Sequence, residues 1–153
     1  MIRLLSLLLV TLFGWNTLFG QSGDPGLVTR RSKFSFSETL ARLEGAIGAT
    51  GDFAVLSKID HAAAAAGAGN PIPPMTLVLF ANPKGGSALQ KAAPTIGLDL
   101  PMRALVWENG SGQVFVTVNS VAWLLARHDL SDRVEVAGKL SALFEKLVLT
   151  ATE

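Results

Sequence analysis

The segment that most restricts the fold is Arg103–Val118, RALVWENGSGQVFVTV, in which two alternating runs flank Asn-Gly-Ser-Gly. Alternation with a period of two is typical of a strand that buries one face. Asparagine and glycine tolerate the positive φ that a tight turn requires. The segment therefore predicts an antiparallel hairpin, and other elements must cover its apolar face.

Three other segments predict further strands. Gly26–Ser32 is read as a first strand, and in the segment 53–59 Phe53, Val55 and Ile59 alternate with Ala54, Leu56 and Lys58. The run MTLVLFANP, residues 75–83, is continuously apolar, which is typical of a central strand buried on both faces. With the hairpin, these segments predict a sheet of about five strands.

Two longer helices are expected. Residues 35–51 begin with the capping box Ser35–Glu38 and place apolar residues at helical spacing. The C-terminal helix is expected to be capped by Ser131, and its core stripe comprises Val136, Leu140, Leu143, Phe144 and Leu147. Glu38 and Arg42 are spaced for an i,i+4 ion pair.

Shorter helices are expected after Ser87 and after Ser120, and the Ala/Gly/Pro segment after His61 is expected to be a loop with one helical turn over Ala62–Ala66. Helices with one apolar face must cover one face of a mostly antiparallel sheet. The predicted class is therefore α+β, with the order β-α-β(4)-α and the helices on one face.

Composition narrows the range of functions. A chain of 153 residues with 49% hydrophobic and 16% charged residues can form one domain with a core and is not a disordered chain. Its formal net charge of +1 argues against nucleic-acid binding, which needs a basic surface. The absence of cysteine excludes disulfides, thiolate metal sites and a cysteine nucleophile.

The N-terminal segment has the layout of a secretory signal peptide over residues 1–22: Arg3, an apolar run from Leu4 to Phe13, and small residues at Gly20 and Ser22. Cleavage is expected after Gly20 or Ser22, which leaves 12 cations and 12 acids. The alternative is an uncleaved membrane anchor formed by residues 4–19. In both cases we expect an exported domain, periplasmic or secreted, and contact with a membrane only through this segment.

Four segments together resemble the bacterial and archaeal "domain of unknown function 302" family: FSFSETLARLEGAI, KIDHAAAAAG, residues 73–116, and LLARHDL. Within them, Ile-Asp-His, Asn-Pro after a strand, Asp-Leu-Pro before a strand and Trp-Glu before a turn match the family in combination. Two departures are Ala81 before Asn-Pro, where the family often has glycine, and Val118, where it often has tyrosine. The resemblance implies one TATA-binding-protein-like domain over residues 26–150, often paired as a homodimer, and no established activity.

Chemically capable residues gather at predicted strand ends and turns, namely Asp60, His61, Asn82, Lys84, Asp99, Arg103, Glu108, Arg127 and His128. Asp60-His61 and His128-Asp129 are carboxylate–imidazole neighbours. If the fold brings His61 and His128 together, they could bind a divalent metal, or b-type haem axially. The alternative is that each histidine only bonds a nearby backbone group.

An anion site is a second hypothesis, because Lys84, Gly85, Gly86 and Ser87 lie between a strand and a helix. The alternative is a loop in which glycine serves the turn and serine the cap. The sequence lacks the spacing of an ATP-binding loop, the nucleophile elbow of hydrolases and the motif for covalent haem.

Three functions remain open. The first is a non-enzymatic exported domain that binds a small ligand, metal or haem, or a protein, as a homodimer. The second is an enzyme in which His61 acts as general base with Asp60 or Glu108. The third is a structural module whose alanine-rich loop, Ala62–Gly69, contacts another chain.

Overall fold

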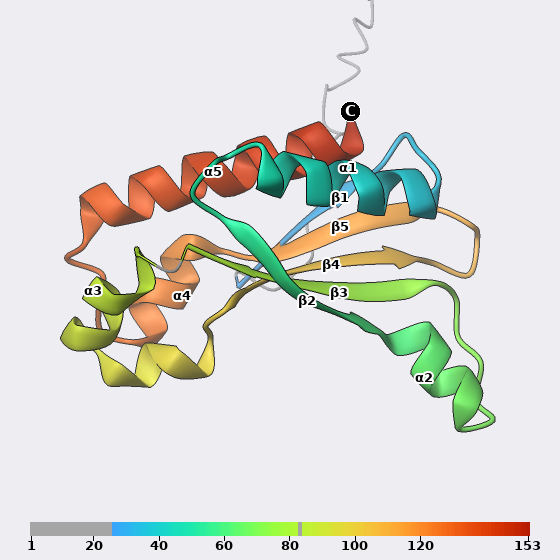
Figure 1. Ribbon diagram of the computed structural model, residues 1–153, viewed down its shortest axis with the longest axis horizontal. Coiled ribbons are helices and arrows are strands. Elements are labelled where there is room, and N and C mark those ends of the chain that lie inside the picture. Colours follow the sequence, from blue (N-terminus) through green and yellow to red (C-terminus); the bar gives the residue numbers. More distant parts are fainter. Residues whose placement is uncertain (1–25, 83) are drawn as a thin grey trace, which may run out of the picture.

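The strands form one antiparallel sheet in the order β1-β5-β4-β3-β2 in the computed structural model, which describes residues 26–82 and 84–153 (Figure 1). The strands are β1 (Leu27–Arg31), β2 (Ala54–Asp60), β3 (Met75–Ala81), β4 (Met102–Glu108) and β5 (Val114–Asn119). The helices are α1 (Phe36–Gly48), α2 (His61–Gly67), α3 (Gly86–Ala92), α4 (Val121–Arg127), α5 (Val134–Thr152) and the 3₁₀ helix η1 (Pro94–Leu98). The predicted α+β class and five-stranded sheet are confirmed.

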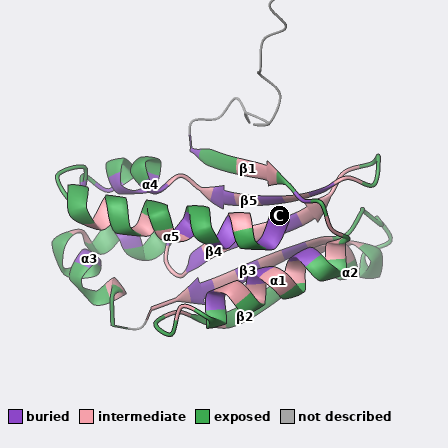
Figure 2. Cartoon of the chain, turned by 90° about the horizontal axis from the view of Figure 1, so that it is seen from above, coloured by how far each residue is buried: buried purple, intermediate pink, exposed green. Residues whose placement is uncertain are grey.

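Helices α1 and α5 lie side by side over one face of the sheet, as Figure 1 shows. Alternate strand residues point into this layer, and their burial appears as purple segments beneath the two helices in Figure 2. The Phe80 ring lies 6.0 Å from that of Phe53 and 5.7 Å from that of Phe144, which joins β3 to α5. The core thus lies between the sheet and these two helices.

The opposite face of the sheet has no helix of the described residues lying across it. In β3, Thr76, Val78 and Phe80 are buried, while Leu77 and Leu79 on the other side are only half-buried. The expectation that this strand is buried on both faces is therefore wrong, because the helices cover one side only. The uncovered face carries apolar side chains, and we call it the open face.

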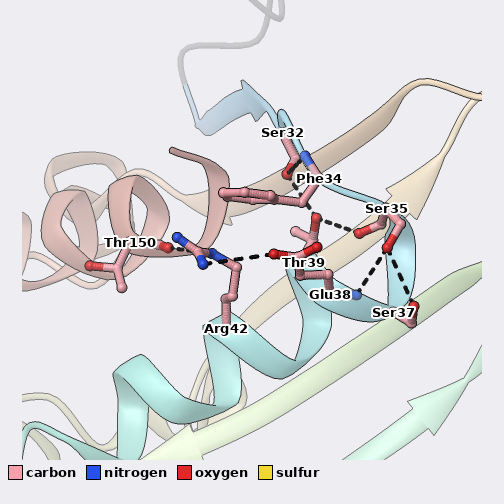
Figure 3. A network of polar contacts seen from close by, with 8 residues as sticks. All are labelled: Ser32, Phe34, Ser35, Ser37, Glu38, Thr39, Arg42 and Thr150. Atoms are coloured by element: carbon pink, nitrogen blue, oxygen red, sulfur yellow. Dashed lines mark hydrogen bonds and ion pairs between the residues drawn. The ribbon is translucent and has the colours of Figure 1, made fainter.

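Residues around the start of α1 tie that helix to β1 and α5 (Figure 3). Ser35 accepts the backbone N–H of Glu38, as the predicted cap requires, and the hydroxyls of Ser32 and Thr39 lie 2.7 Å apart. Arg42 pairs with Glu38 at 3.8 Å, as predicted, and its Nε donates to the carbonyl of Thr150. The polar residues here serve packing of the helix layer.

Two predicted helix starts are wrong. Helix α3 begins at Gly86, one residue before Ser87, and no side chain caps it. The chain already turns at this point, because the N–H groups of Gly85 and Gly86 donate to the carbonyl of Asn82. Helix α5 begins at Val134, because Ser131 lies in a turn closed by the bond from Arg133 N to Leu130 O.

The remaining predicted elements are found close to their expected bounds. The hairpin turn is closed by Asn109, whose side-chain oxygen accepts the N–H groups of Ser111 and Gln113. Ser120 caps α4, as predicted, and the helical turn expected over Ala62–Ala66 extends to His61–Gly67. The predicted signal peptide lies outside the described residues. Within the part of the chain that is described, no helix has the length and apolar character of a membrane span.

Candidate functional site: a buried aspartate between two arginines

Asp99 lies directly after η1, and its carboxylate is the centre of a charged cluster. The side chain is 5% exposed. Its Oδ1 lies 2.6 Å from Arg103 Nη2, and its Oδ2 lies 3.2 Å from Arg127 Nη1. Arg103 comes from the start of β4 and Arg127 from the last turn of α4, so one carboxylate joins three elements of the fold.

His128, directly after α4, completes the cluster from inside the protein. Its Nε2 lies 2.8 Å from Asp99 Oδ2, and its Nδ1 lies 3.0 Å from Thr95 Oγ1. An ionised carboxylate only accepts hydrogen bonds, so Nε2 carries the proton and, in the neutral ring, Nδ1 accepts from the Thr95 hydroxyl. Both ring nitrogens are therefore engaged within the protein.

The pKa of Asp99 is set by opposing effects. Burial of the carboxyl raises its pKa, but the hydrogen bond from His128 and the charges of Arg127 and Arg103 together lower it below the usual value of 3.8. Asp99 is therefore ionised at neutral pH. With a neutral imidazole, the cluster of Asp99, Arg103 and Arg127 carries one excess positive charge.

The cluster opens onto a cavity of about 390 Å³ in the open face of the sheet. Leu77 of β3 and Leu105 of β4 are directly paired across the two strands. Their side chains lie on the open face and form part of the cavity floor. Trp123 and Arg127 line it from α4, and the Arg127 guanidinium lies 5.5 Å from the Trp123 ring centroid. We call this cavity the arginine pocket.

The guanidinium groups keep donors available to a ligand. Asp99 takes one terminal nitrogen of each arginine, and the side chains of Arg103 and Arg127 remain 37% and 48% exposed. Guanidinium groups match the geometry of carboxylate and phosphate oxygens. The arrangement can therefore hold an anion beside a partly apolar floor.

His61 lies at the opposite end of the sheet from His128. Asp60, just before it, pairs with Thr76, which pairs with Val106 near the end of β4, whereas Asp99 precedes the start of that strand. Figure 1 likewise places α2 at one end and α4 at the other. Joint ligation of a metal or haem by His61 and His128 within one chain is excluded by this placement.

The Asp60 side chain caps α2 by accepting the N–H of Ala63 at 2.9 Å. Its carboxylate is thus used by the backbone. Glu108 ends β4 at the same end of the sheet as Asp60 and His61, and its N–H donates to the carbonyl of Pro74. No group of three or more metal-ligating side chains occurs among residues 26–82 and 84–153.

The predicted anion loop uses its own donors internally. The N–H groups of Lys84 and Gly85 donate to the side-chain oxygen of Asn82, at 2.9 and 3.2 Å. Gly86 N–H is directed to the Asn82 carbonyl, and the Ser87 hydroxyl to the Lys84 carbonyl. These contacts match the simpler reading of a glycine-containing turn.

Sequence reasoning identified Asp99, Arg103, Arg127 and His128 as separate residues at strand ends, but not as one cluster. It missed Thr95 and Trp123. Thr95 follows a proline in a short turn, and Trp123 sits on a helix that reads as core, so neither shows a pattern of its own. The spacing of Asp99 and Arg103, four residues apart across a strand start, was the available signal.

The comparisons with known proteins agree with this fold. A family model described as "Domain of unknown function DUF302" matches residues 28–147. A crystal structure of an uncharacterized conserved DUF302 protein from Bacillus stearothermophilus superposes with a TM-score of 0.75 at 17% sequence identity, covering 84% of this chain and 99% of that one. At that identity the likeness concerns the fold.

Curated relatives carry a functional name. Proteins called fluoride-specific ion channel FluC 1, from Brucella suis and Brucella abortus, are each 47% identical over 116 residues, or 76% of this chain. The matched part is only 45% and 43% of those two proteins. The chain thus spans less than half the length of the curated relatives it matches.

Proposed function

Because the chain belongs to the DUF302 family, a domain of unknown function, we propose a function from the site itself: it is an exported, non-enzymatic domain that binds a small anion. The binding site is the arginine pocket. Export is supported by the cation, apolar run and small residues of the first 22 positions, with a membrane anchor over residues 4–19 as the alternative.

The observation that carries the proposal is the excess charge of the cluster. Two guanidinium groups share one buried carboxylate at the wall of a 390 Å³ cavity. Asp99 holds both guanidinium groups in place before a ligand arrives, which lowers the ordering cost of binding. A carboxylate or another small oxyanion would accept the remaining donors.

The same geometry disfavours general-base catalysis on a ligand in this pocket. Both ring nitrogens of His128 are engaged, by Asp99 and Thr95. A base would need a free nitrogen within reach of the reacting proton. The enzymatic alternative then rests on His61 and Glu108 at the far end of the sheet, where Asp60 already serves as a helix cap.

Fluoride belongs among the anions to be tested. The curated relatives are named for a fluoride channel, and fluoride is a small anion. The chain covers less than half of those proteins, so their activity is a reason to include fluoride as a probe rather than to assign it.

Isothermal titration calorimetry with acetate, phosphate and fluoride tests the proposal. We expect at least one anion to bind, and Arg103→Gln and Arg127→Gln each to weaken it about tenfold or more, since a hydrogen bond to a charged group contributes roughly 1.5–3 kcal/mol. Arg42→Gln is the matched control, because its side chain is 38% exposed and lies by α1 and α5. Equal loss in all three variants, or no binding by the native protein, contradicts the proposal.

A homodimer through the open face is a second part of the proposal. This face carries the half-buried apolar side chains of Leu79, Leu105, Trp107 and Phe115 on neighbouring strands, and the last two rings stack with centroids 4.7 Å apart. Five strands spaced about 4.8 Å apart give this face a footprint of roughly 500 Å², or about 1,000 Å² for two copies. That area reaches the lower limit of specific interfaces.

Sedimentation of the native protein and of Leu79→Lys tests the dimer. We expect a dimer for the native chain and a monomer for the variant, because Leu79 lies opposite Arg103 on the open face and a lysine there adds a charge without a partner to the interface. Val134→Lys, at an exposed position on α5, is the control and should remain dimeric. A monomeric native protein at micromolar concentration would refute this part of the proposal.

A further inference from the structure

A second cavity, of about 560 Å³, lies between α3, α5 and the edge strand β2. It shares no lining residue with the arginine pocket. Its walls are mainly apolar, and they include Leu56, Leu89, Leu100, Met102 and Leu140. Cavities of about 300–1,000 Å³ with such walls hold small organic ligands. We call it the α3–α5 cleft.

A bulge in β2 gives the cleft one of its walls. The register of β2 on β3 shifts between Val55 and Ser57, so Leu56 has no partner of its own in the ladder. Val55 and Lys58 both face the helix layer, which strict alternation would not allow: Val55 packs on the core and Lys58 pairs with Glu44 of α1. A bulge redirects a side chain, and here Leu56 lines the cleft.

Leu56 is also an exposed apolar side chain, at 57% of its surface. Contact with an apolar ligand would remove the apolar surface of this leucine from water, which is favourable. The cleft therefore offers an apolar wall that the chain itself leaves open to solvent at this edge.

Polar groups stand beside this wall. Lys139 lines the cleft from α5, and Ser87 and Gln90 line it from α3. The Lys139 amine lies 2.6 Å from Glu135 Oε1, but both side chains are largely in water, where such a pair is weak. Glu135 does not line the cleft. Lys139 can therefore turn to an anionic group placed there.

We propose that the α3–α5 cleft binds a straight-chain monocarboxylate, with the alkyl chain against the leucine-rich wall and the carboxylate at Lys139. An apolar tail satisfies the walls, and a single negative head group matches the single lysine of the lining. The proposal goes beyond anion binding in the arginine pocket, because the two sites use different residues.

Calorimetric titration with dodecanoate, kept below its micelle concentration, tests this proposal. Dodecyltrimethylammonium has the same chain with a cationic head. We expect saturable binding of dodecanoate that is about tenfold or more tighter than that of the cationic amphiphile. Equal binding of dodecanoate and dodecyltrimethylammonium would mean that only the alkyl chain is adsorbed, and it would overturn the proposal.

Variants locate the site. Lys139→Glu and Leu56→Glu should each weaken dodecanoate binding about tenfold or more, while Lys146→Glu, an exposed lysine two turns later on α5, should leave it unchanged. All three changes are at exposed positions, and thermal unfolding checks that each variant is folded. Unchanged binding in Lys139→Glu or Leu56→Glu, or equal loss in Lys146→Glu, overturns the assignment. Arg103→Gln tells the two sites apart: loss of dodecanoate binding in that variant, with binding retained in Lys139→Glu, would place the ligand in the arginine pocket and overturn the assignment.

Discussion

Asp99 is the residue that holds the arginine pocket together. It lies against Arg103, Arg127 and His128, so its removal leaves two cations and an imidazole without their acceptor. Because Arg103 and Arg127 are 37% and 48% exposed and can return to solvent, the expected cost is that of hydrogen bonds to a charged group, about 1.5–3 kcal/mol. Asp99→Asn should lower the free energy of unfolding by about that amount, measured by urea denaturation at neutral pH. A loss below about 1 kcal/mol would mean that the carboxylate acts as an ordinary surface charge.

The same residue gives a pH dependence. Because the pKa of Asp99 is lower in the folded protein than its usual value of 3.8, the unfolded chain takes up the proton first. Its stabilising contribution is complete above about pH 4 and is lost as the pH falls through the folded-state pKa. Urea midpoints measured from neutral pH to about pH 3 should therefore fall more steeply for the native protein than for Asp99→Asn. Parallel curves would contradict this account.

At the scale of single residues, the sequence reveals candidates but not their partners. Asp99, Arg103, Arg127 and His128 stand out as charged or titratable residues at strand ends, yet only the fold decides that they meet. His61 stands out equally and lies at the other end of the sheet. Nothing local distinguishes the two histidines, because each follows or precedes an aspartate.

At the scale of elements, the Asp-His pair in the segment SKIDHAAAAAG marks the start of a helix. Asp60 caps α2, and His61 is its first residue. Asp60→Ala should lower the free energy of unfolding by about 1 kcal/mol, the usual cost of losing an N-cap. His61→Ala should change it less and should leave anion binding intact. Loss of anion binding in His61→Ala would return this histidine to the site.

The helices and strands themselves could largely be predicted from the sequence, but the residues at which some helices begin could not. Alternation and apolar spacing identify the strands and the long helices, since a buried face imposes its period on the sequence. The starts of α3 and α5 escaped prediction, because bonds to Asn82 and Leu130 decide them rather than the nearest serine. The bulge at Leu56 escaped as well: alternation places Val55 and Ile59 on one face, whereas the register shift leaves Val55 opposite Phe80 and Ile59 opposite Leu77, on opposite faces of the sheet.

At the scale of the whole molecule, the helices on one face of the sheet determine where function can lie. They leave the open face uncovered, with the arginine pocket at its α4 end, and it is on this face that we propose a second copy to dock. Leu77 and Leu105 belong to both the open face and the pocket floor, so dimerisation and anion binding are expected to be linked. The amphipathic helices predicted that one face of the sheet is covered. The continuous apolar run of β3 did not reveal that the other face of this strand is only half-buried.

Export is a prediction that rests on residues 1–22. Expressed in a bacterium, the protein should be recovered from the periplasm or medium, with a mature N-terminus at Gln21 or Gly23, as cleavage after Gly20 or Ser22 requires. Mass spectrometry of the intact protein identifies that terminus. Recovery in the membrane fraction with residues 1–22 retained would favour the anchor, and recovery in the cytoplasm would contradict export.

The proposed function depends on Arg103 and Arg127 binding one anion together. The most direct measurement follows the Nε–H signals of arginine side chains by NMR while acetate, phosphate or fluoride is added. We expect the signals of Arg103 and Arg127 to shift with the same saturable dependence on one of these anions, and the signal of Arg42 to stay in place. Absence of a saturable shift, or equal shifts of all three arginines, would contradict the claim.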